Sequence, residues 1–136
     1  MTASELRIGN YISWTFDNEC YSVSEIFDSE DYLIKTNNVN KKSLTGRPDQ
    51  LKAILLSEEW LLKLDFKKRV SAKTIRDYID YSKGNMVCNI SLNGVEIEYC
   101  AAWQPIDEKT HIATLQHVHQ LQNLYFALTG TELKMF

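Results

Sequence analysis

The sequence lacks a long hydrophobic run and a dense set of cysteines. Nowhere do about 18 apolar residues occur together, so no transmembrane helix is predicted. The opening segment, MTASELRIGNYISW, carries charges early and has no apolar run of signal-peptide length, and we therefore expect a cytoplasmic protein. Cys20, Cys88 and Cys100 form no closely spaced pair, and an odd number of cysteines argues against a disulfide framework.

The short motifs of common enzyme classes are also missing. The five glycines are scattered, and none forms a G-x-x-x-x-G-K phosphate loop or a G-x-G-x-x-G dinucleotide loop. There is no G-x-S-x-G, and each cysteine lies in an expected strand, so the cysteines are interpreted as small buried hydrophobic residues. A net charge of −3 gives no general attraction to nucleic acid or anionic lipid. These absences favour a protein that is not an enzyme and needs no cofactor.

The composition is that of one globular domain. A chain of 136 residues has the length of a typical domain, and 44% hydrophobic with 24% charged residues is an ordinary globular balance. We expect a single α+β domain over residues 1–136. Its first part, residues 1–64, is predicted to be β-rich and barrel-like, and residues 65–136 to hold a hairpin and a C-terminal helix.

The first part begins with a pattern of alternating apolar and polar residues. Three strands are predicted, over residues 11–16, 20–27 and 32–36. In the first of them Ile12, Trp14 and Phe16 alternate with polar neighbours and should share the buried face. Residues 17–19, with the sequence Asp-Asn-Glu, should form the turn that follows.

The rest of the first part predicts a long connection, a strand and a short helix. Residues 37–50 are rich in Asn, Lys, Gly and Pro and should form an exposed connection. Residues 51–56 fit a buried strand, and Ser57 is placed to cap a helix that runs from Glu58 to about Leu64. Together these elements predict a curled antiparallel sheet or a small SH3-like barrel with a short helix.

The second part contains a strong hairpin signal. Asn93-Gly94 separates two strand patterns, residues 86–92 and 95–101, as in a two-residue β-turn. Residues 111–115 can form one further strand. Residues 66–81 fit either a helix or a strand, because their apolar positions agree with both periods.

An amphipathic helix is predicted over residues 116–129, with Gly130 at its C-terminal cap. Its apolar stripe consists of Val118, Leu121, Leu124, Tyr125 and Leu128. We expect the hairpin of residues 86–101 to cover this stripe. The opposite face would then present a subunit interface, and a homo-oligomer is predicted; the candidate interface residues are His119, Gln122, Asn123 and Phe126.

The histidines do not have the spacing of a metal site. His117 and His119 lie two residues apart on the expected helix, about 200° around its axis, whereas helical metal ligands need a spacing of three or four. No metal site is predicted. One of these histidines is interpreted as bonding backbone groups, and the other as facing water.

Two pairs of carboxylates could in principle carry acid–base chemistry. Glu96 and Glu98 share a strand face, and Asp77 and Asp80 would share a helix face. Solvated surface positions explain both pairs, because a perturbed pKa requires burial. A small enzyme using an acidic pair is therefore the second alternative.

Aromatic and basic residues suggest a binding site. Rings that stack on a planar group, next to cations that bind phosphate, would take a nucleotide-like anion. The candidate residues are Tyr11, Trp14, Lys41, Lys42, Arg47 and Trp103. With the basic run of residues 67–69, the same groups allow the first alternative, an SH3-like module associated with nucleic acid. That alternative ranks lower because of the acidic net charge.

Three blocks of the sequence resemble a known family. ELRIGNYI near the start, LKAILLSEEWLLKLDF in the middle and VHQLQNLYFALTGTEL at the end are similar to small uncharacterised proteins of Bacteroides-group bacteria and their phages and prophages. The resemblance implies an accessory protein of a phage or mobile element, acting in the host cytoplasm. Such proteins often bind a host protein, or sequester a small nucleotide signal as an anti-defence measure, commonly as homo-oligomers.

Overall fold

A computed structural model of the protein describes residues 1–27, 33–71, 78–99 and 110–135, and its α+β class is as predicted. The chain divides into two compact units, which are described separately. The first comprises Met1–Leu55 and His117–Leu133, and the second Leu56–Gln116 and Lys134–Phe136. The prediction grouped the C-terminal helix with the hairpin of residues 65–136. That helix belongs to the first unit, because its bonds are to residues near the start of the chain.

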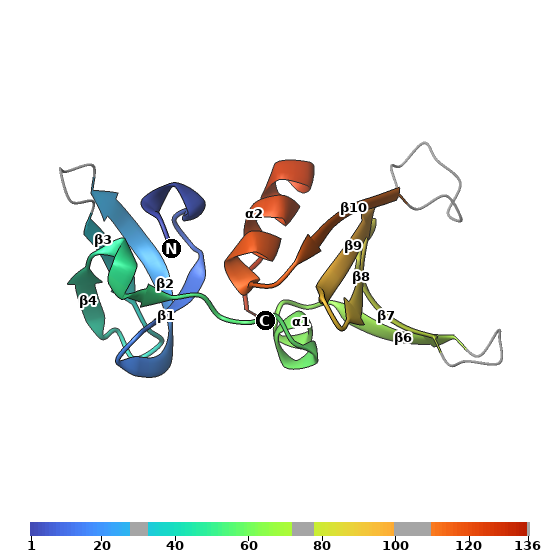
Figure 1. Ribbon diagram of the computed structural model, residues 1–136, viewed down its shortest axis with the longest axis horizontal. Helices are drawn as coiled ribbons and strands as arrows, with labels where there is room; N and C mark the ends of the chain where they lie inside the picture. Colours follow the sequence, from blue (N-terminus) through green and yellow to red (C-terminus); the bar gives the residue numbers. More distant parts are fainter. Residues whose placement is uncertain (28–32, 72–77, 100–109, 136) are drawn as a thin grey trace. The chain divides into compact units, whose positions relative to one another are not determined.

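The first unit contains an open antiparallel sheet of five strands in the order β4-β3-β2-β1-β5 (Figure 1). The strands are β1 (Tyr11–Trp14), β2 (Asp17–Phe27), β3 (Leu33–Asn37), β4 (Ser43–Gly46) and β5 (Leu51–Lys52). A meander followed by a strand that returns to β1 is the connectivity of an SH3-like barrel. However, β4 and β5 are edges that do not pair with each other, so the predicted antiparallel sheet is observed and the alternative, a closed barrel, is not.

The core of this unit lies on the predicted face of β1 and β2. Ile12, Trp14, Tyr21 and Val23 are fully or almost fully buried, as the alternation indicates. Phe16 was predicted to join them but is 67% exposed, because the chain turns at residues 15–16. The turn comes earlier than predicted, since β2 already begins at Asp17, opposite Trp14.

Residues 37–50 contain more structure than the predicted exposed connection. Residues 43–46 form β4, which pairs with β3, and its Leu44 packs against the core. The side chain of Asn38 closes the turn before it by accepting bonds from the backbone N–H groups of Asn40 and Lys42. The next predicted strand, residues 51–56, is reduced to Leu51–Lys52.

Helix α2 (Val118–Thr129) completes the first unit. It ends as predicted at Gly130, whose φ of 73° is the left-handed conformation that glycine adopts easily. It begins two residues later than predicted, because His117 has extended backbone angles and serves as the N-cap. Its buried residues also differ from the predicted stripe: they include the polar residues His119 and Gln122, whereas Leu128 is 39% exposed.

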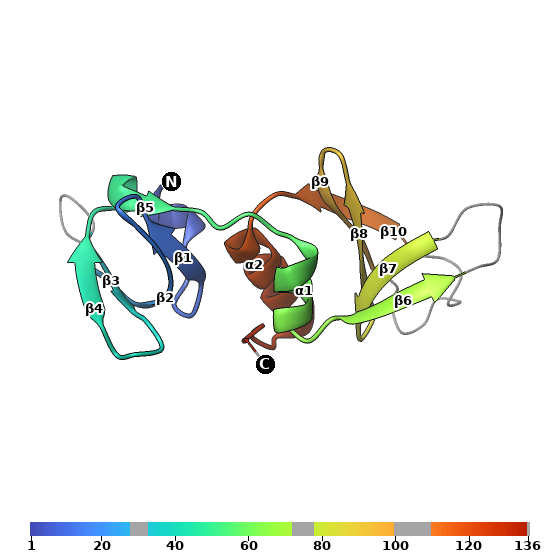
Figure 2. The same ribbon diagram turned by 90° about the horizontal axis from the view of Figure 1, so that it is seen from below.

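The second unit contains another antiparallel sheet of five strands, in the order β10-β9-β8-β7-β6 (Figure 2). Its elements are α1 (Glu58–Lys63), β6 (Lys67–Ser71), β7 (Tyr78–Lys83), β8 (Met86–Ser91), β9 (Gly94–Tyr99) and β10 (Thr110–Leu115). Helix α1 is capped as predicted, with the Ser57 hydroxyl accepting a bond from the Trp60 N–H at 3.3 Å. In the part of the chain that the structure describes, no helix has both the length and the apolar character needed to cross a membrane.

Two features of this unit refine the sequence interpretation. The segment of residues 66–81, which fitted either a helix or a strand, contributes strand residues to β6 and β7. The hairpin β8–β9 is present, but its turn is formed by Leu92 and Asn93, and Gly94 is already paired with Ser91. The predicted turn is therefore displaced by one residue.

Candidate functional site

The predicted aromatic groups do not form an exposed stacking surface. Trp14 is 1% exposed, and its Nε1–H donates to the Thr36 hydroxyl at 3.0 Å. Gly46 lies against the ring so closely that a Cβ atom there would be 2.7 Å from it. Tyr11 points to the other side of β1 because strand residues alternate. Trp14 is thus a core residue, and Trp103 lies outside the described residues.

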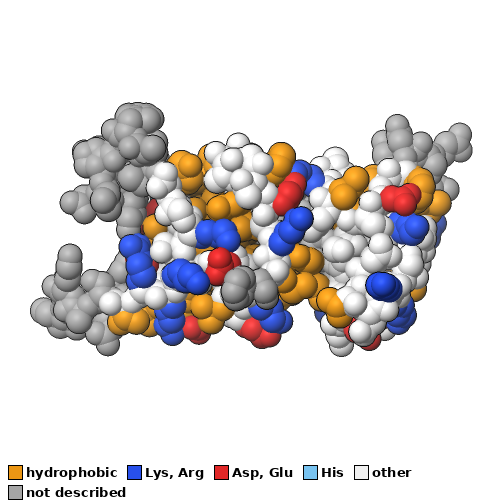
Figure 3. All heavy atoms as spheres, turned by 180° about the vertical axis from the view of Figure 1, so that it is seen from behind, with side chains coloured by type: hydrophobic (Ala, Val, Ile, Leu, Met, Phe, Trp, Pro, Cys, Tyr) orange, Lys and Arg blue, Asp and Glu red, His pale blue; other side chains and the backbone are white. Residues whose placement is uncertain are grey.

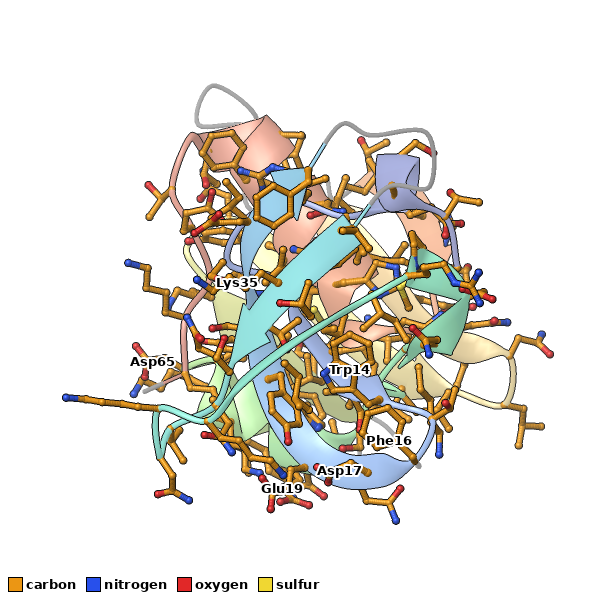
Figure 4. The ribbon with its side chains drawn as sticks, turned by 90° about the vertical axis from the view of Figure 1, so that its left-hand side faces the viewer. Trp14, Phe16, Asp17, Glu19, Lys35 and Asp65 are labelled. Atoms are coloured by element: carbon orange, nitrogen blue, oxygen red, sulfur yellow. The ribbon has the colours of Figure 1, made fainter. Side chains whose placement is uncertain are left out.

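The predicted cations are paired or held in turns. Lys42 Nζ lies 3.5 Å from Asp17 Oδ2, and the Tyr21 hydroxyl donates to the same oxygen at 2.6 Å. This bond from Tyr21 is the main reason why the pKa of Asp17 is lowered, and it raises the pKa of Tyr21. Figure 4 shows Asp17 at the start of β2, beside Phe16, which stacks on Trp14. The cluster joins Lys42 and Tyr21 to the start of β2.

The remaining predicted cations, Lys41 and Arg47, are exposed on either side of β4. Arg47 Nε lies 3.6 Å from the Asp49 carboxylate, and both side chains are exposed. Lys41 has a φ of 63° in the turn before β4. The buried Trp14 does not present its ring to an anion there, and the role of the other predicted residues stays a prediction.

The basic run of β6 is neutralised within the second unit. Each of its cations contacts a carboxylate: Lys67 with Asp65, Lys68 with Glu58 and Arg69 with Asp80. On the face shown in Figure 3, Lys and Arg side chains are interspersed with Asp and Glu. This pattern does not favour a nucleic-acid surface, which concentrates basic residues.

The structure describes three of the four carboxylates of the proposed acidic pairs, Asp80, Glu96 and Glu98. Asp80 is buried and accepts two bonds from the Arg69 guanidinium, at 2.8 and 3.1 Å, so its carboxylate is held by an ion pair. Asp77 lies outside the described residues. Glu96 and Glu98 share one face of β9, opposite Thr114 and His111 of β10.

Gln122, predicted to lie on an outer face of the helix, is fully buried. Its Oε1 accepts the Tyr11 N–H at 2.8 Å, and its Nε2 donates to the carbonyls of Gly9 and Leu133 at 3.0 and 3.1 Å. The side chain thus satisfies backbone groups at the start of β1 and near the chain's end. The prediction of an exposed interface residue is wrong here, because an apolar stripe does not reveal a polar side chain with such partners.

Asn123 and Phe126 also contact residues near the start of the chain. The Asn123 Oδ1 accepts from the Asn10 amide, and its Nδ2 donates to the Glu5 carbonyl, both at 2.9 Å. The ring of Phe126 is 37% exposed, and the Arg7 guanidinium lies 3.8 Å above its centroid. Phe126 keeps an exposed edge, and its role in an oligomer remains a prediction.

A pocket of about 260 Å³ lies within the first unit, at the start of α2. Its lining residues are Met1, Glu5, Leu51, Ala53, His117, His119 and Gln120. His117 precedes the helix and His119 lies in its first turn, so the angle of 200° expected within a continuous helix does not apply. Their rings are nearly parallel, at 19°, with centroids 5.8 Å apart. Two histidines predicted to diverge therefore line the same pocket.

His119 is the unusual member of this pocket. The residue is only 4% exposed, and its Nδ1 is buried with no hydrogen-bond partner among the described residues. Burial lowers the pKa of the imidazole, and His117 lowers it further, so the ring is neutral near pH 7. The interpretation that the histidines bond backbone or face water is wrong for His119, because its first-turn position places it against the pocket.

Glu5 supplies a negative charge to the same pocket. It ends the one-turn helix η1 (Ala3–Glu5), and its Oε2 accepts the Thr2 N–H at 2.8 Å. This bond is the main cause of its lowered pKa, and the amino group of Met1 and His119 act in the same direction. The carboxylate is therefore ionised at neutral pH. Sequence reasoning missed Glu5, although Thr2 and Glu5 have the Ser/Thr-x-x-Glu spacing of a helix start.

The ionisable side chains that line the pocket are Glu5, His117 and His119. Among the described residues, no cluster of three or more His, Cys, Asp or Glu side chains is arranged to hold a metal ion. Burial raises the pKa of the Cys88 thiol to about 12, so it is not a thiolate at neutral pH. No protein-family model, curated protein or solved structure matches the chain, and the assignment of function rests on this site.

Proposed function

We propose that the protein is a non-catalytic binding protein that takes a small molecule in the pocket at the start of α2. The observation that carries the proposal is the pocket itself, whose lining brings the buried His119 and the Glu5 carboxylate together with apolar side chains. Concave sites of this kind are the usual places where proteins bind small molecules.

The size of the pocket supports a ligand smaller than a typical drug. Its volume of about 260 Å³ lies just below the range of sites for drug-sized molecules. Apolar contact is offered by Leu51 and Ala53, and polar contact by Glu5 and His119. A few polar groups against an apolar wall are typical of sites that orient a small ligand.

The biological setting in this proposal comes from the resemblance to phage and prophage proteins. In that setting the protein would be an accessory protein in the host cytoplasm that sequesters a small nucleotide-like signal, commonly as a homo-oligomer. The pocket would then hold only part of such a ligand, with the remainder outside it. Sequestration requires tight binding and no turnover.

The proposal is tested by identifying what the purified protein releases on denaturation. Wild type is compared with Ala53→Phe, which fills the pocket, and with Ala127→Phe, an equal change at an exposed position of α2. We expect wild type and Ala127→Phe to release the same unmodified molecule, and folded Ala53→Phe to release none. Release of a chemically altered ligand contradicts the non-catalytic role. Equal release by folded Ala53→Phe contradicts the site.

A further inference from the structure

The turn between β8 and β9 holds the one Asn-Gly pair of the sequence, Asn93-Gly94. Asn93 is exposed, and its backbone N–H donates to the Ser91 hydroxyl at 3.3 Å. That hydroxyl donates to the Gly94 carbonyl at 3.1 Å. These bonds hold the backbone of the turn and leave the Asn93 side chain at the surface.

The fold requires glycine at position 94. Its φ of 132° is a conformation that residues with a side chain rarely adopt. A Cβ atom there would also lie 2.6 Å from the carbonyl oxygen of Leu115 in β10. The contact with β10 therefore places a residue without a side chain directly after Asn93, and no side chain hinders the main-chain nitrogen of Gly94.

We infer that Asn93 is a site of spontaneous covalent modification, in which the Gly94 nitrogen attacks the side-chain amide carbon of Asn93. The new C–N bond closes a succinimide ring. The bond from the same carbon to the amide nitrogen breaks, and ammonia leaves with the proton of the Gly94 nitrogen. Water then opens the ring at either carbonyl and gives aspartate or isoaspartate. No group is oxidised or reduced, and asparagine is among the thermally labile residues.

The place of the pair in the sheet allows the attack. Gly94 pairs with Ser91 at the very end of the β8–β9 ladder. The ends of elements open at little cost in free energy, so the Gly94 nitrogen can leave the ladder while the sheet stays folded.

Asn85 provides a control within the same molecule. It lies in the turn between β7 and β8 and is exposed, as Asn93 is. The residue after it is Met86, whose side chain is fully buried. That side chain hinders the nitrogen of its own peptide and fixes the peptide against the core. The two asparagines therefore share exposure and turn position and differ in the residue that follows.

The site is tested by incubating the full chain at mildly alkaline pH and following its proteolytic peptides by mass spectrometry. We expect the Asn93 peptide to be lost to the acid form while the Asn85 peptide stays unchanged. Asn93→Gln keeps an amide but would have to close a less favourable six-membered ring, so its peptide should also stay unchanged. An unchanged Asn93 peptide, or equal conversion at Asn85, overturns the inference.

The isoaspartate product should also weaken the sheet. It adds a negative charge and lengthens the main chain of the turn by one carbon atom, whereas aspartate adds the charge alone. Because Gly94 has no spare room against Leu115, the longer chain should disturb the contact between β9 and β10.

Asn93→Asp separates the charge from the longer main chain. Converted protein, isolated by anion exchange through its added charge, is compared with fresh wild type and with Asn93→Asp in urea denaturation. We expect the converted protein to unfold at a lower urea concentration, and Asn93→Asp to unfold as wild type does. Equal midpoints for all three would overturn the effect on the β9–β10 contact.

Discussion

Two buried polar side chains of α2, His119 and Gln122, lie one turn apart and differ in their bonding. Gln122 is fully buried, and its amide makes three hydrogen bonds to backbone groups. His119 is 4% exposed, and its Nδ1 makes none. Burial of a polar group costs stability unless another hydrogen-bond partner replaces the water that it loses. Gln122 finds these partners within the protein, whereas no described residue bonds to the Nδ1 of His119.

The largest loss of stability is expected when Gln122, the residue with three hydrogen bonds, is replaced. Gln122→Met keeps most of the volume but leaves the Tyr11 N–H and two carbonyls without their partner. We expect the free energy of unfolding, measured by urea denaturation, to fall by about 3 kcal/mol. A loss below about 1 kcal/mol would show that water replaces these bonds, so that Gln122 would not differ from His119 in its contribution to stability.

The same substitution at His119 should raise the free energy of unfolding rather than lower it. His119→Met removes a buried nitrogen without a partner, so we expect the ligand-free protein to gain about 1 kcal/mol in urea denaturation. Destabilisation comparable to that of Gln122→Met would mean that His119 has the same structural role as Gln122.

A smaller effect is expected from pH. The folded state lowers the pKa of His119 from its ordinary value of 6.5, so below that value the unfolded chain binds more protons than the folded one. Stability contributed at His119 should therefore be present above pH 6.5 and be lost as the pH falls toward the folded pKa. Between pH 7 and pH 6 we expect wild type to lose less than about 1 kcal/mol through this group.

The variants assign this loss to one residue. His119→Met should show a flatter dependence of unfolding free energy on pH, measured by urea denaturation at each pH. His111→Gln, at an exposed position of β10, should behave as wild type does. If the three proteins have the same dependence, burial of His119 does not control its protonation.

The contrast between these two residues also explains which features could be predicted from the sequence. The strand alternation of residues 11–14, the Ser57 cap and the Gly130 terminus are local signals, and the structure contains all three. The site is not local. Glu5, Leu51 and His119 meet only because a returning strand and a C-terminal helix reach the start of the chain. A two-residue error in the start of α2 was enough to separate the two histidines in the prediction.

The smallest effect on stability is expected at the exposed end of the same helix face, where oligomerisation was predicted. Phe126 is stacked with Arg7 but partly exposed, so Phe126→Lys should cost no more than about 1 kcal/mol. The folded variant should have a lower mass in light scattering than wild type. Phe27→Lys, at a similarly exposed position of β2, should keep the wild-type mass. An unchanged mass in Phe126→Lys would exclude this ring from a subunit interface. Loss of folding would show that the contact with Arg7 is as structural as the bonds of Gln122.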